Sequence, residues 1–205
     1  MSIQKIKGLV VSVGIGVAAS LLIGSQAHAA FSPGNILDDE TFNNYSAMDA
    51  TQINNFLNGF SYSCISPNSG FSAMLPAGYT PSGGYTYGAY VTAGEVIAKA
   101  AQIYELNPRV LIVTLEKEQS LVTGRNSTSY CSPSLDGNHK YAAAVGYGCP
   151  DGGSTYSYSG LNLYKRNGVV QSEVNPTCVN SAAKAGFSQQ VIRAAWLLKF
   201  GQQRS

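Results

Sequence analysis

The sequence has little charge, little histidine and, beyond its first residues, no long apolar run. Charged residues make up 12% of the 205 residues, with 13 basic against 11 acidic ones. It lacks the basic patch typical of nucleic-acid-binding proteins, so we expect no nucleic acid as a partner. One of the two histidines, His28, lies in the N-terminal apolar segment, which leaves His139. A single histidine, with cysteines at spacings that do not match a zinc site, predicts neither a metal nor a cofactor.

The N-terminal apolar segment, Leu9 to Ile23, is typical of a secretory signal peptide. It follows the basic residues Lys5 and Lys7 and ends in an Ala-x-Ala pattern at 27–29, so we expect residues 1–29 to be removed. An uncleaved membrane anchor is the alternative, but the segment is short for a bilayer span and no later segment is apolar enough for one. Cleavage leaves 11 basic and 11 acidic residues. The sequence thus predicts an exported, nearly neutral protein, located in the periplasm, in the cell wall or outside the cell.

Four cysteines follow the signal segment: Cys64, Cys131, Cys149 and Cys178. An even number of cysteines in an exported chain predicts two disulfides. Three pairings are possible and spacing does not select one; our preferred pairing joins Cys131 to Cys149 and Cys64 to Cys178. A free thiol would allow a different function, a cysteine amidase or peptidase that uses Cys149 or Cys131 with His139.

Apolar residues at helical spacing predict a mainly α fold, with α+β possible, and long loops rich in Gly, Tyr and Ser. We expect residues 92–205 to form the main domain and residues 30–91 to form an N-terminal arm and loop packed on it. Three helices should carry the core: about 93–106, about 108–122 and about 187–200. Trp196 falls among the apolar residues of the last helix, where we expect it to lie in the core.

Three local motifs mark where helices begin. Asp49 with Gln52 and Thr92 with Glu95 each have the spacing of a capping box. Asn107 can accept hydrogen bonds from the first turn of a helix, and the proline that follows it suits the first helical position.

Two glutamates near the end of the second core helix occupy different faces of it. At about 100° per residue, Glu118 lies in line with Leu111 and Leu115, whereas Glu116 points toward the polar side. A carboxyl group surrounded by apolar side chains keeps its proton near neutral pH and can act as a general acid. The alternatives are that Glu118 is half-exposed at the end of the stripe, or that it bonds to a neighbouring element and has only a structural role.

The stretch 111–120 (Leu-Ile-Val-Thr-Leu-Glu-Lys-Glu-Gln-Ser) resembles the catalytic helix of the lysozyme-like lytic transglycosylases. Glu118-Gln119 falls where that family has Glu-Ser, and the stretch 144–150 (Ala-Val-Gly-Tyr-Gly-Cys-Pro) looks like its Gly-Leu-Met-Gln stretch. Cys149 stands near the position of the family's glutamine, and the later Ala-Tyr-Asn motif is not found. More closely, the motifs at 117–123 (Lys-Glu-Gln-Ser-Leu-Val-Thr) and 146–151 (Gly-Tyr-Gly-Cys-Pro-Asp) resemble a group of secreted bacterial proteins often found beside wall-binding repeats.

The resemblance implies a lysozyme-like helical domain that cleaves peptidoglycan glycan strands. Glu118 would protonate the glycosidic oxygen and then act as base while the muramic acid 6-hydroxyl closes a 1,6-anhydro ring. A muramidase would need a second carboxylate about 5–9.5 Å away; Asp151 is the first candidate and Asp136 the second, although aspartate before glycine also favours a plain turn. Substrate contacts would come from four residues: Gln119, Gly146, Tyr147 and Gly148.

A non-catalytic module on the same fold is the main alternative. Such a module would bind cell-wall carbohydrate through aromatic side chains and would not need a protonated glutamate. The sequence does not decide between the two.

Overall fold

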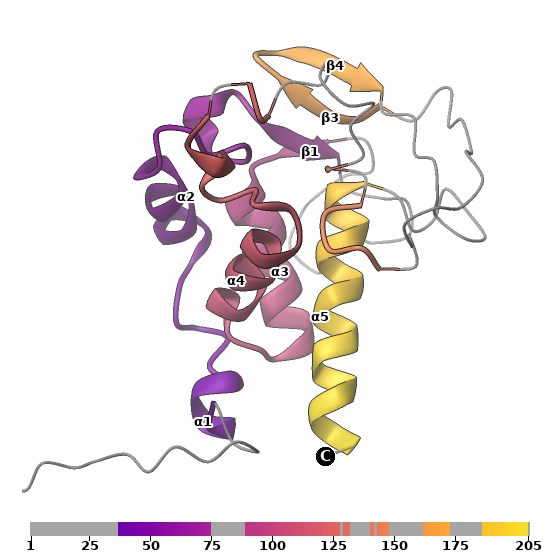
Figure 1. Cartoon of the computed structure of the whole chain (residues 1–205). Helices are drawn as coiled ribbons and strands as arrows, with labels where there is room; N and C mark the ends of the chain where they lie inside the picture. The colour runs from indigo at the N-terminus through magenta and orange to yellow at the C-terminus, as the bar shows by residue number, and fades with distance from the viewer. Residues whose placement is uncertain are drawn as a thin grey trace, which may run out of the picture. The chain divides into compact units, whose positions relative to one another are not determined.

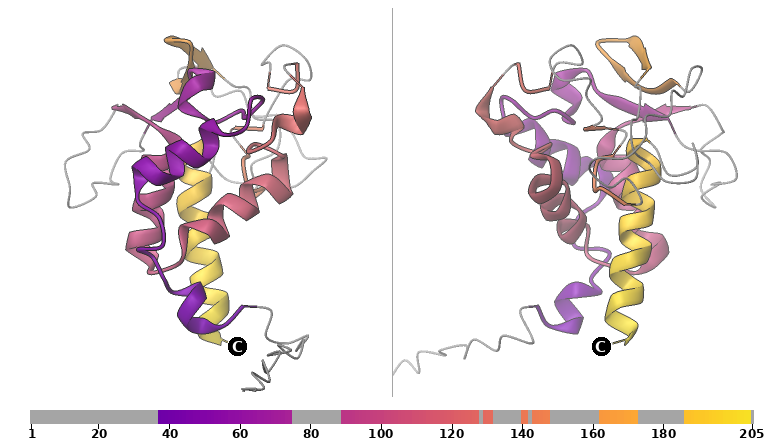
Figure 2. Two further views of the ribbon diagram at one scale, coloured as in Figure 1. Left: turned by 90° about the vertical axis from the view of Figure 1, so that its left-hand side faces the viewer. Right: turned by 45° about the vertical axis from the view of Figure 1, so that its right-hand side comes forward.

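Helix α3 (Ala93–Tyr104) is the central element of the computed structural model, and α2 (Ala50–Asn58) and α5 (Phe187–Arg204) pack on it. The structure describes residues 37–74, 89–127, 129–131, 140–141, 143–147, 162–172 and 186–204. Within these ranges, no helix combines the length and the hydropathy needed to cross a bilayer. Figure 1 shows α5 running alongside α3, and the left view of Figure 2 shows α4 set at an angle to α5.

The start of α3 is fixed by its capping box and by α2. Thr92 accepts from the Glu95 amide at 3.2 Å, and the Glu95 carboxylate accepts from the Thr92 amide at 2.7 Å. From α2, the Asn54 side chain donates to Thr92 Oγ1 at 3.0 Å and accepts from the Gly94 amide at 3.1 Å. A Cβ at Gly94 would overlap the Asn54 side chain and the Ala50 carbonyl, so this close helix contact requires glycine.

Helix α4 (Pro108–Gln119) returns after a tight turn and buries Leu111, Ile112 and Leu115. The Asn107 side chain caps it, accepting from the Arg109 amide at 3.0 Å. The short helix α1 (Asp39–Phe42) contacts the start of α4, because the backbone amide of Asn107 donates to the Phe42 carbonyl at 2.6 Å.

Helix α1 also meets the last turns of α5. Gln202 donates to Asp39 at 2.8 Å, and Lys199 donates to Asn43 at 2.7 Å. At its own start, α1 is capped by Asp38, and the hydrogen bonds from the Thr41 amide and hydroxyl lower the pKa of that carboxyl group.

A small antiparallel sheet lies at the end where α5 begins (Figure 1). Its order is β2-β1-β3-β4, and its strands are β1 (Ser72–Met74), β2 (Tyr90–Val91), β3 (Asn162–Arg166) and β4 (Val169–Ser172). Ala73 pairs with Val91 on one side and with Tyr164 on the other. The β3–β4 hairpin turns at Asn167 and Gly168, which have φ of 49° and 75°; both residue types tolerate this left-handed conformation.

Four aromatic rings join the sheet to the helices: Phe71, Tyr141, Tyr164 and Phe187. All four are buried, and their centroids lie 4.4–5.8 Å apart in the contacting pairs. Large aromatic side chains bury the most apolar surface per residue, so this cluster contributes strongly to the core.

The predicted helical core is confirmed. The helices expected at about 93–106, 108–122 and 187–200 are α3, α4 and α5, although α4 ends three residues earlier than expected. The fold is mostly helical with a small antiparallel sheet, of α+β type. The β3–β4 hairpin was not predicted, and the signal segment lies outside the described residues.

Candidate functional site

The candidate site is the C-terminal end of α4, where the chain reverses sharply. Ser120 has φ 47° and ends the helix, and its amide donates to the Glu116 carbonyl at 2.8 Å. The reversal returns Leu121 and Val122 to the core, where they are 0% and 3% exposed. These two residues fill the space beneath the last turn of α4.

Glu116 holds this reversal in place. One of its carboxylate oxygens accepts from the amides of Val122 and Thr123 at 3.1 and 3.0 Å, and the other accepts from Thr123 Oγ1 at 2.7 Å. The side chain is half-buried, not on the solvated polar face where helical spacing placed it. Because its oxygens satisfy donors of the loop, Glu116 has a structural role.

Glu118 is not buried: the expectation that apolar side chains surround it is wrong, and the alternative, a glutamate partly exposed at the end of the stripe, is what the structure shows. Its side chain is 39% exposed, and its carboxylate lies 3.5 Å from the ammonium group of Lys117, which is 79% exposed. Glu118 is in register with Leu111 and Leu115, but the helix ends one residue later and Leu121 and Val122 complete the core instead. In the described part of the chain, no other side chain engages the Glu118 carboxylate.

Two cations flank the ring of Tyr130 at the same end of α4. The Arg125 guanidinium lies 4.8 Å and the Lys140 ammonium 4.0 Å from its centroid, and Lys140 also donates to the Tyr130 carbonyl at 3.1 Å. The Tyr130 hydroxyl donates to the Gln119 carbonyl at 2.9 Å, which fixes the ring next to the residue that follows Glu118. Cations over an aromatic face are attracted by its quadrupole, so the ring holds positive charge near the C-terminal end of α4.

A disulfide fastens this loop to the N-terminal arm, and it joins Cys64 to Cys131. Our preferred pairing, Cys131 with Cys149 and Cys64 with Cys178, is therefore wrong. The pairing follows from long-range packing: the Cys64 amide donates to the Leu121 carbonyl at 2.9 Å, which brings the arm against the loop. The bond also excludes Cys131 as a free nucleophile for a cysteine amidase or peptidase.

Tyr147 and Gly146 lie on a loop that a buried glutamine holds against α5. Gln190 is 0% exposed; its oxygen accepts from the Tyr147 amide at 3.0 Å and its nitrogen donates to the Tyr147 carbonyl at 3.1 Å. The Gln190 side-chain amide therefore pairs with both the N–H and the C=O of Tyr147, as the backbone of a neighbouring β-strand would. Sequence reasoning missed Gln190, although an amide between Phe187 and Val191 on an apolar helix face was a visible signal.

The ring of Tyr147 contacts Trp196 on α5, with centroids 6.4 Å apart and planes at 87°. We expected Trp196 to lie in the core, and this expectation is wrong: its side chain is 39% exposed. The exposed residues of this stretch, Arg193, Trp196, Leu197 and Phe200, recur at helical spacing, so Trp196 lies on the face of α5 that is turned away from the core.

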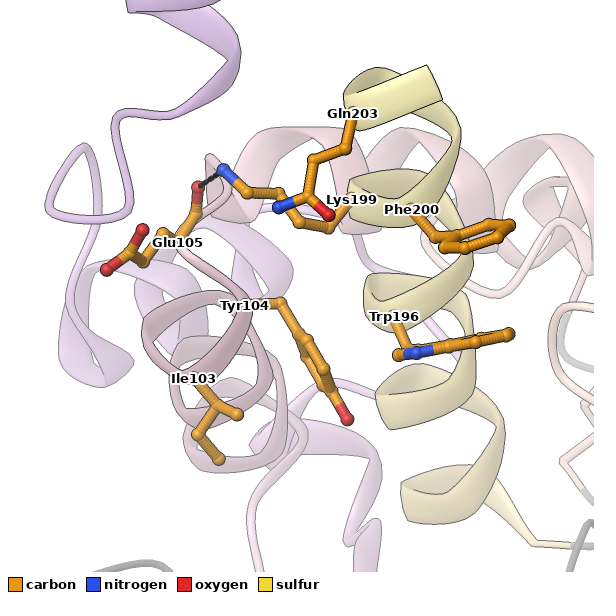
Figure 3. A pocket seen from close by; sticks show the side chains of 7 residues that line it. All are labelled: Ile103, Tyr104, Glu105, Trp196, Lys199, Phe200 and Gln203. Carbon is orange, nitrogen blue, oxygen red and sulfur yellow. Dashed lines mark hydrogen bonds between the residues drawn. The ribbon is translucent and has the colours of Figure 1, made fainter.

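Trp196 borders a hollow of about 240 Å³ between the C-terminal ends of α3 and α5 (Figure 3). Its lining residues are Ile103, Tyr104, Glu105, Trp196, Lys199, Phe200 and Gln203. The Lys199 ammonium donates to the Glu105 carbonyl at 3.2 Å and so joins the two helices at its rim.

Several predicted site residues lie outside the described residues: Gly148, Cys149, Asp151, Asp136, His139 and Cys178. Whether Asp151 or Asp136 approaches Glu118 stays a prediction. Among the residues that the structure does describe, no group of histidine, cysteine and acidic side chains could hold a metal ion.

In comparisons with known proteins, no family model, no curated protein and no solved structure matches this chain.

Proposed function

We propose that this chain is a secreted, peptidoglycan-cleaving glycosidase of the lytic transglycosylase or muramidase type, with a lysozyme-like helical fold and Glu118 as its general acid and base. The observation that carries the proposal is the contrast between the two glutamates of α4. The Glu116 carboxylate is occupied by three hydrogen bonds, whereas the Glu118 carboxylate is open to solvent at the helix end. Of the two, Glu118 is the one whose carboxylate accepts no hydrogen bond from the loop, which is why we assign the proton transfer to it.

The reaction needs two proton transfers at the same carboxyl group. Glu118 donates its proton to the glycosidic oxygen as the bond from that oxygen to C1 of the muramic acid breaks, and this proton leaves with the N-acetylglucosamine hydroxyl. In a transglycosylase, the muramic 6-hydroxyl oxygen then bonds to C1 and passes its own proton to Glu118, which restores the acid.

Positive charge near the C-terminal end of α4 favours peptidoglycan over a neutral glycan as substrate. Arg125 and Lys140 are held on Tyr130, whose hydroxyl is bonded to the residue next to Glu118. Peptidoglycan carries carboxylates on its muramic acid and peptide stems, and opposite charge within reach favours association and orientation. The Cys64–Cys131 bridge agrees with an exported location, because disulfides persist in oxidising compartments.

The test is mass analysis of purified peptidoglycan after digestion by the mature protein. Anhydro ends identify a transglycosylase and reducing ends a muramidase. Glu118→Gln should lower the rate by about 10²–10⁴-fold while retaining the fold. The matched control is Glu40→Gln, which changes another exposed glutamate and should leave turnover unchanged. Full activity of Glu118→Gln would refute the assignment.

A non-catalytic carbohydrate-binding module is the second candidate, and a specific observation favours it. The described residues do not enclose Glu118, while exposed aromatic rings border a hollow on α5. This function predicts that the wild type binds sacculi without releasing fragments, and that Glu118→Gln binds them equally well. The same digestion, combined with a pull-down on insoluble peptidoglycan, separates the two functions.

A further inference from the structure

We infer that the outward face of α5 docks this protein on an anionic phospholipid surface. This docking face consists of five exposed residues: Arg193, Trp196, Leu197, Phe200 and Arg204. At about 100° per residue they fall within an arc of about 100° on one side of the helix. Figure 3 shows the rings of Trp196 and Phe200 projecting from α5 on the side away from α3. The docking face does not include Glu118, so the inference does not depend on the proposed catalysis.

The centre of the docking face is an apolar ridge. Leu197 is 49% exposed, and Trp196 and Phe200 are each 39% exposed. The two rings stack on one another with planes at 14°, and Tyr147 and Arg204 lie at the two ends of this stack. The ring faces are therefore covered, and the ring edges form the exposed surface together with Leu197. Three large apolar side chains gathered on one face are typical of an interaction surface.

Both ends of this ridge carry positive charge. Arg193 and Arg204 are eleven residues apart, which is about 16 Å along a helix, and the apolar side chains lie between them. Helix α5 contains no aspartate or glutamate. The acid that contacts it from α1, Asp39, binds Gln202, which helical spacing places on the opposite side of α5. The docking face is thus apolar in the middle and basic at both ends.

This distribution of charge does not suit a second copy of the chain. In a two-fold dimer the same surface of each copy faces the other. If two α5 helices packed in antiparallel fashion, Arg193 would face Arg204 of the other copy, and if they packed in parallel, each arginine would face its equivalent. Like charges meet in both cases, which opposes association. An anionic partner is complementary to both arginines.

A bilayer fits this face better than an acidic protein does. A protein that used these aromatic residues as anchors would enclose them in a pocket, but the ring faces of Trp196 and Phe200 are already covered. A fluid bilayer needs only an exposed ridge: interfacial helices lie in the plane of the surface, with Trp, Phe and Leu at the boundary between headgroups and acyl chains. Arginines can extend from that depth to the lipid phosphates. A chain that is exported meets the outer face of the membrane that it crossed.

Trp196 can report on the docking, because it is the one tryptophan in the sequence. The full mature chain is titrated with vesicles of equal parts phosphatidylglycerol and phosphatidylcholine, and separately with vesicles of phosphatidylcholine alone. We expect a saturable blue shift of the tryptophan emission with the anionic vesicles, since the indole leaves water, and at least tenfold weaker binding to the neutral ones. Added salt should weaken binding to the anionic vesicles, because it screens the arginines.

Two pairs of variants separate the charge from the apolar ridge. Arg193→Gln should weaken binding about 5-fold, the contribution of one basic residue near an anionic surface. Its matched control is Arg109→Gln, which changes an exposed arginine of α4 outside the docking face. Leu197→Ala should weaken binding about 5- to 10-fold by removing apolar surface, whereas its control Val113→Ala, 65% exposed on α4, should bind like the wild type. If one variant loses its helical circular dichroism signal, the other still tests the face.

Four results would overturn the inference. The first is the absence of a saturable shift with the anionic vesicles, and the second is equal binding to the neutral ones. The third is an equal loss in each variant and its control, because general charge or apolar surface would then explain the binding. The fourth is a different occupant, shown by sedimentation of a dimer that Leu197→Ala dissociates, or by an emission shift with soluble polyglutamate but not with vesicles.

Discussion

Replacing Glu116 and Glu118 by alanine, one at a time, should separate a structural glutamate from a functional one. Glu116→Ala removes the acceptor of three hydrogen bonds, two of them from backbone amides that start the returning chain. A hydrogen bond contributes about 0.5–1.5 kcal/mol net. Because Glu116 is half-buried and water can reach some of these donors, we expect a loss of about 2 kcal/mol in the free energy of unfolding.

Glu118→Ala should leave the free energy of unfolding within about 0.5 kcal/mol of the wild type. Its ion pair with Lys117 is exposed on both sides, and such pairs contribute about 0–1 kcal/mol. In a domain of this size, 1 kcal/mol shifts the melting temperature by about 2–4 °C. Thermal melts should therefore show a fall of about 4–8 °C for Glu116→Ala and at most about 2 °C for Glu118→Ala.

Thr123→Val is the internal check on this reasoning. It removes the bond from the Thr123 hydroxyl to Glu116 and leaves the two amide bonds, so it should cost about a third of the Glu116→Ala effect. When Glu116→Ala and Thr123→Val are combined, the loss in free energy of unfolding should be smaller than the sum of the two single losses, because both changes remove the same contact. A larger loss for Glu118→Ala than for Glu116→Ala would refute the structural role of Glu116.

Three further changes probe the scaffold around the site. Replacing Cys64 and Cys131 together by serine opens a loop between residues 67 apart in sequence; loop entropy predicts a loss of about 4 kcal/mol, measurable by urea unfolding against the oxidised wild type. Gly124→Ala should destabilise the protein by more than about 1 kcal/mol in the same assay, because φ is +57° and a Cβ would overlap the Tyr62 carbonyl; a neutral result would contradict this close approach. Gln190→Leu should cost about 2 kcal/mol by leaving backbone groups of the loop at 143–147 without partners, and hydrogen exchange at the Tyr147 amide should rise; unchanged protection would disprove the anchor.

Local chemistry explains why the helix starts were predictable from sequence. Asp49, Thr92 and Asn107 each bond to an amide two or three residues ahead. Such contacts depend on a few consecutive residues and not on the rest of the fold, so the motif is sufficient. The hairpin at Asn167-Gly168 was equally local, and we missed it although Asn-Gly is a strong turn signal.

Burial at helix ends was not predictable, because it depends on what lies beyond the end of the helix. Helical spacing correctly placed Glu118 on the same side of α4 as the apolar residues. It did not predict that Glu118 is exposed, because the returning Leu121 fills the core at that point. Trp196 was misplaced for a different reason: it lies on the exposed face of α5 with Arg193, Leu197 and Phe200, and an apolar residue does not by itself show which face of a helix is covered. The cysteine pairing failed for a related reason: it is set by the approach of the arm to the loop, and no local pattern encodes that approach.

The stabilising contacts around the end of α4 bear on the function of Glu118. Its neighbours are fixed by a disulfide at Cys131, by the hydrogen bonds of Glu116 and by the Tyr130 hydroxyl, yet the Glu118 carboxylate itself is left in solvent. A group that must transfer a proton cannot spend its oxygens on permanent hydrogen bonds, so its position has to be fixed by the residues around it. Glu118 differs from Glu116 in this respect but not from an exposed glutamate such as Glu40, so the Glu118→Gln digestion and its Glu40→Gln control are the measurements that decide its role.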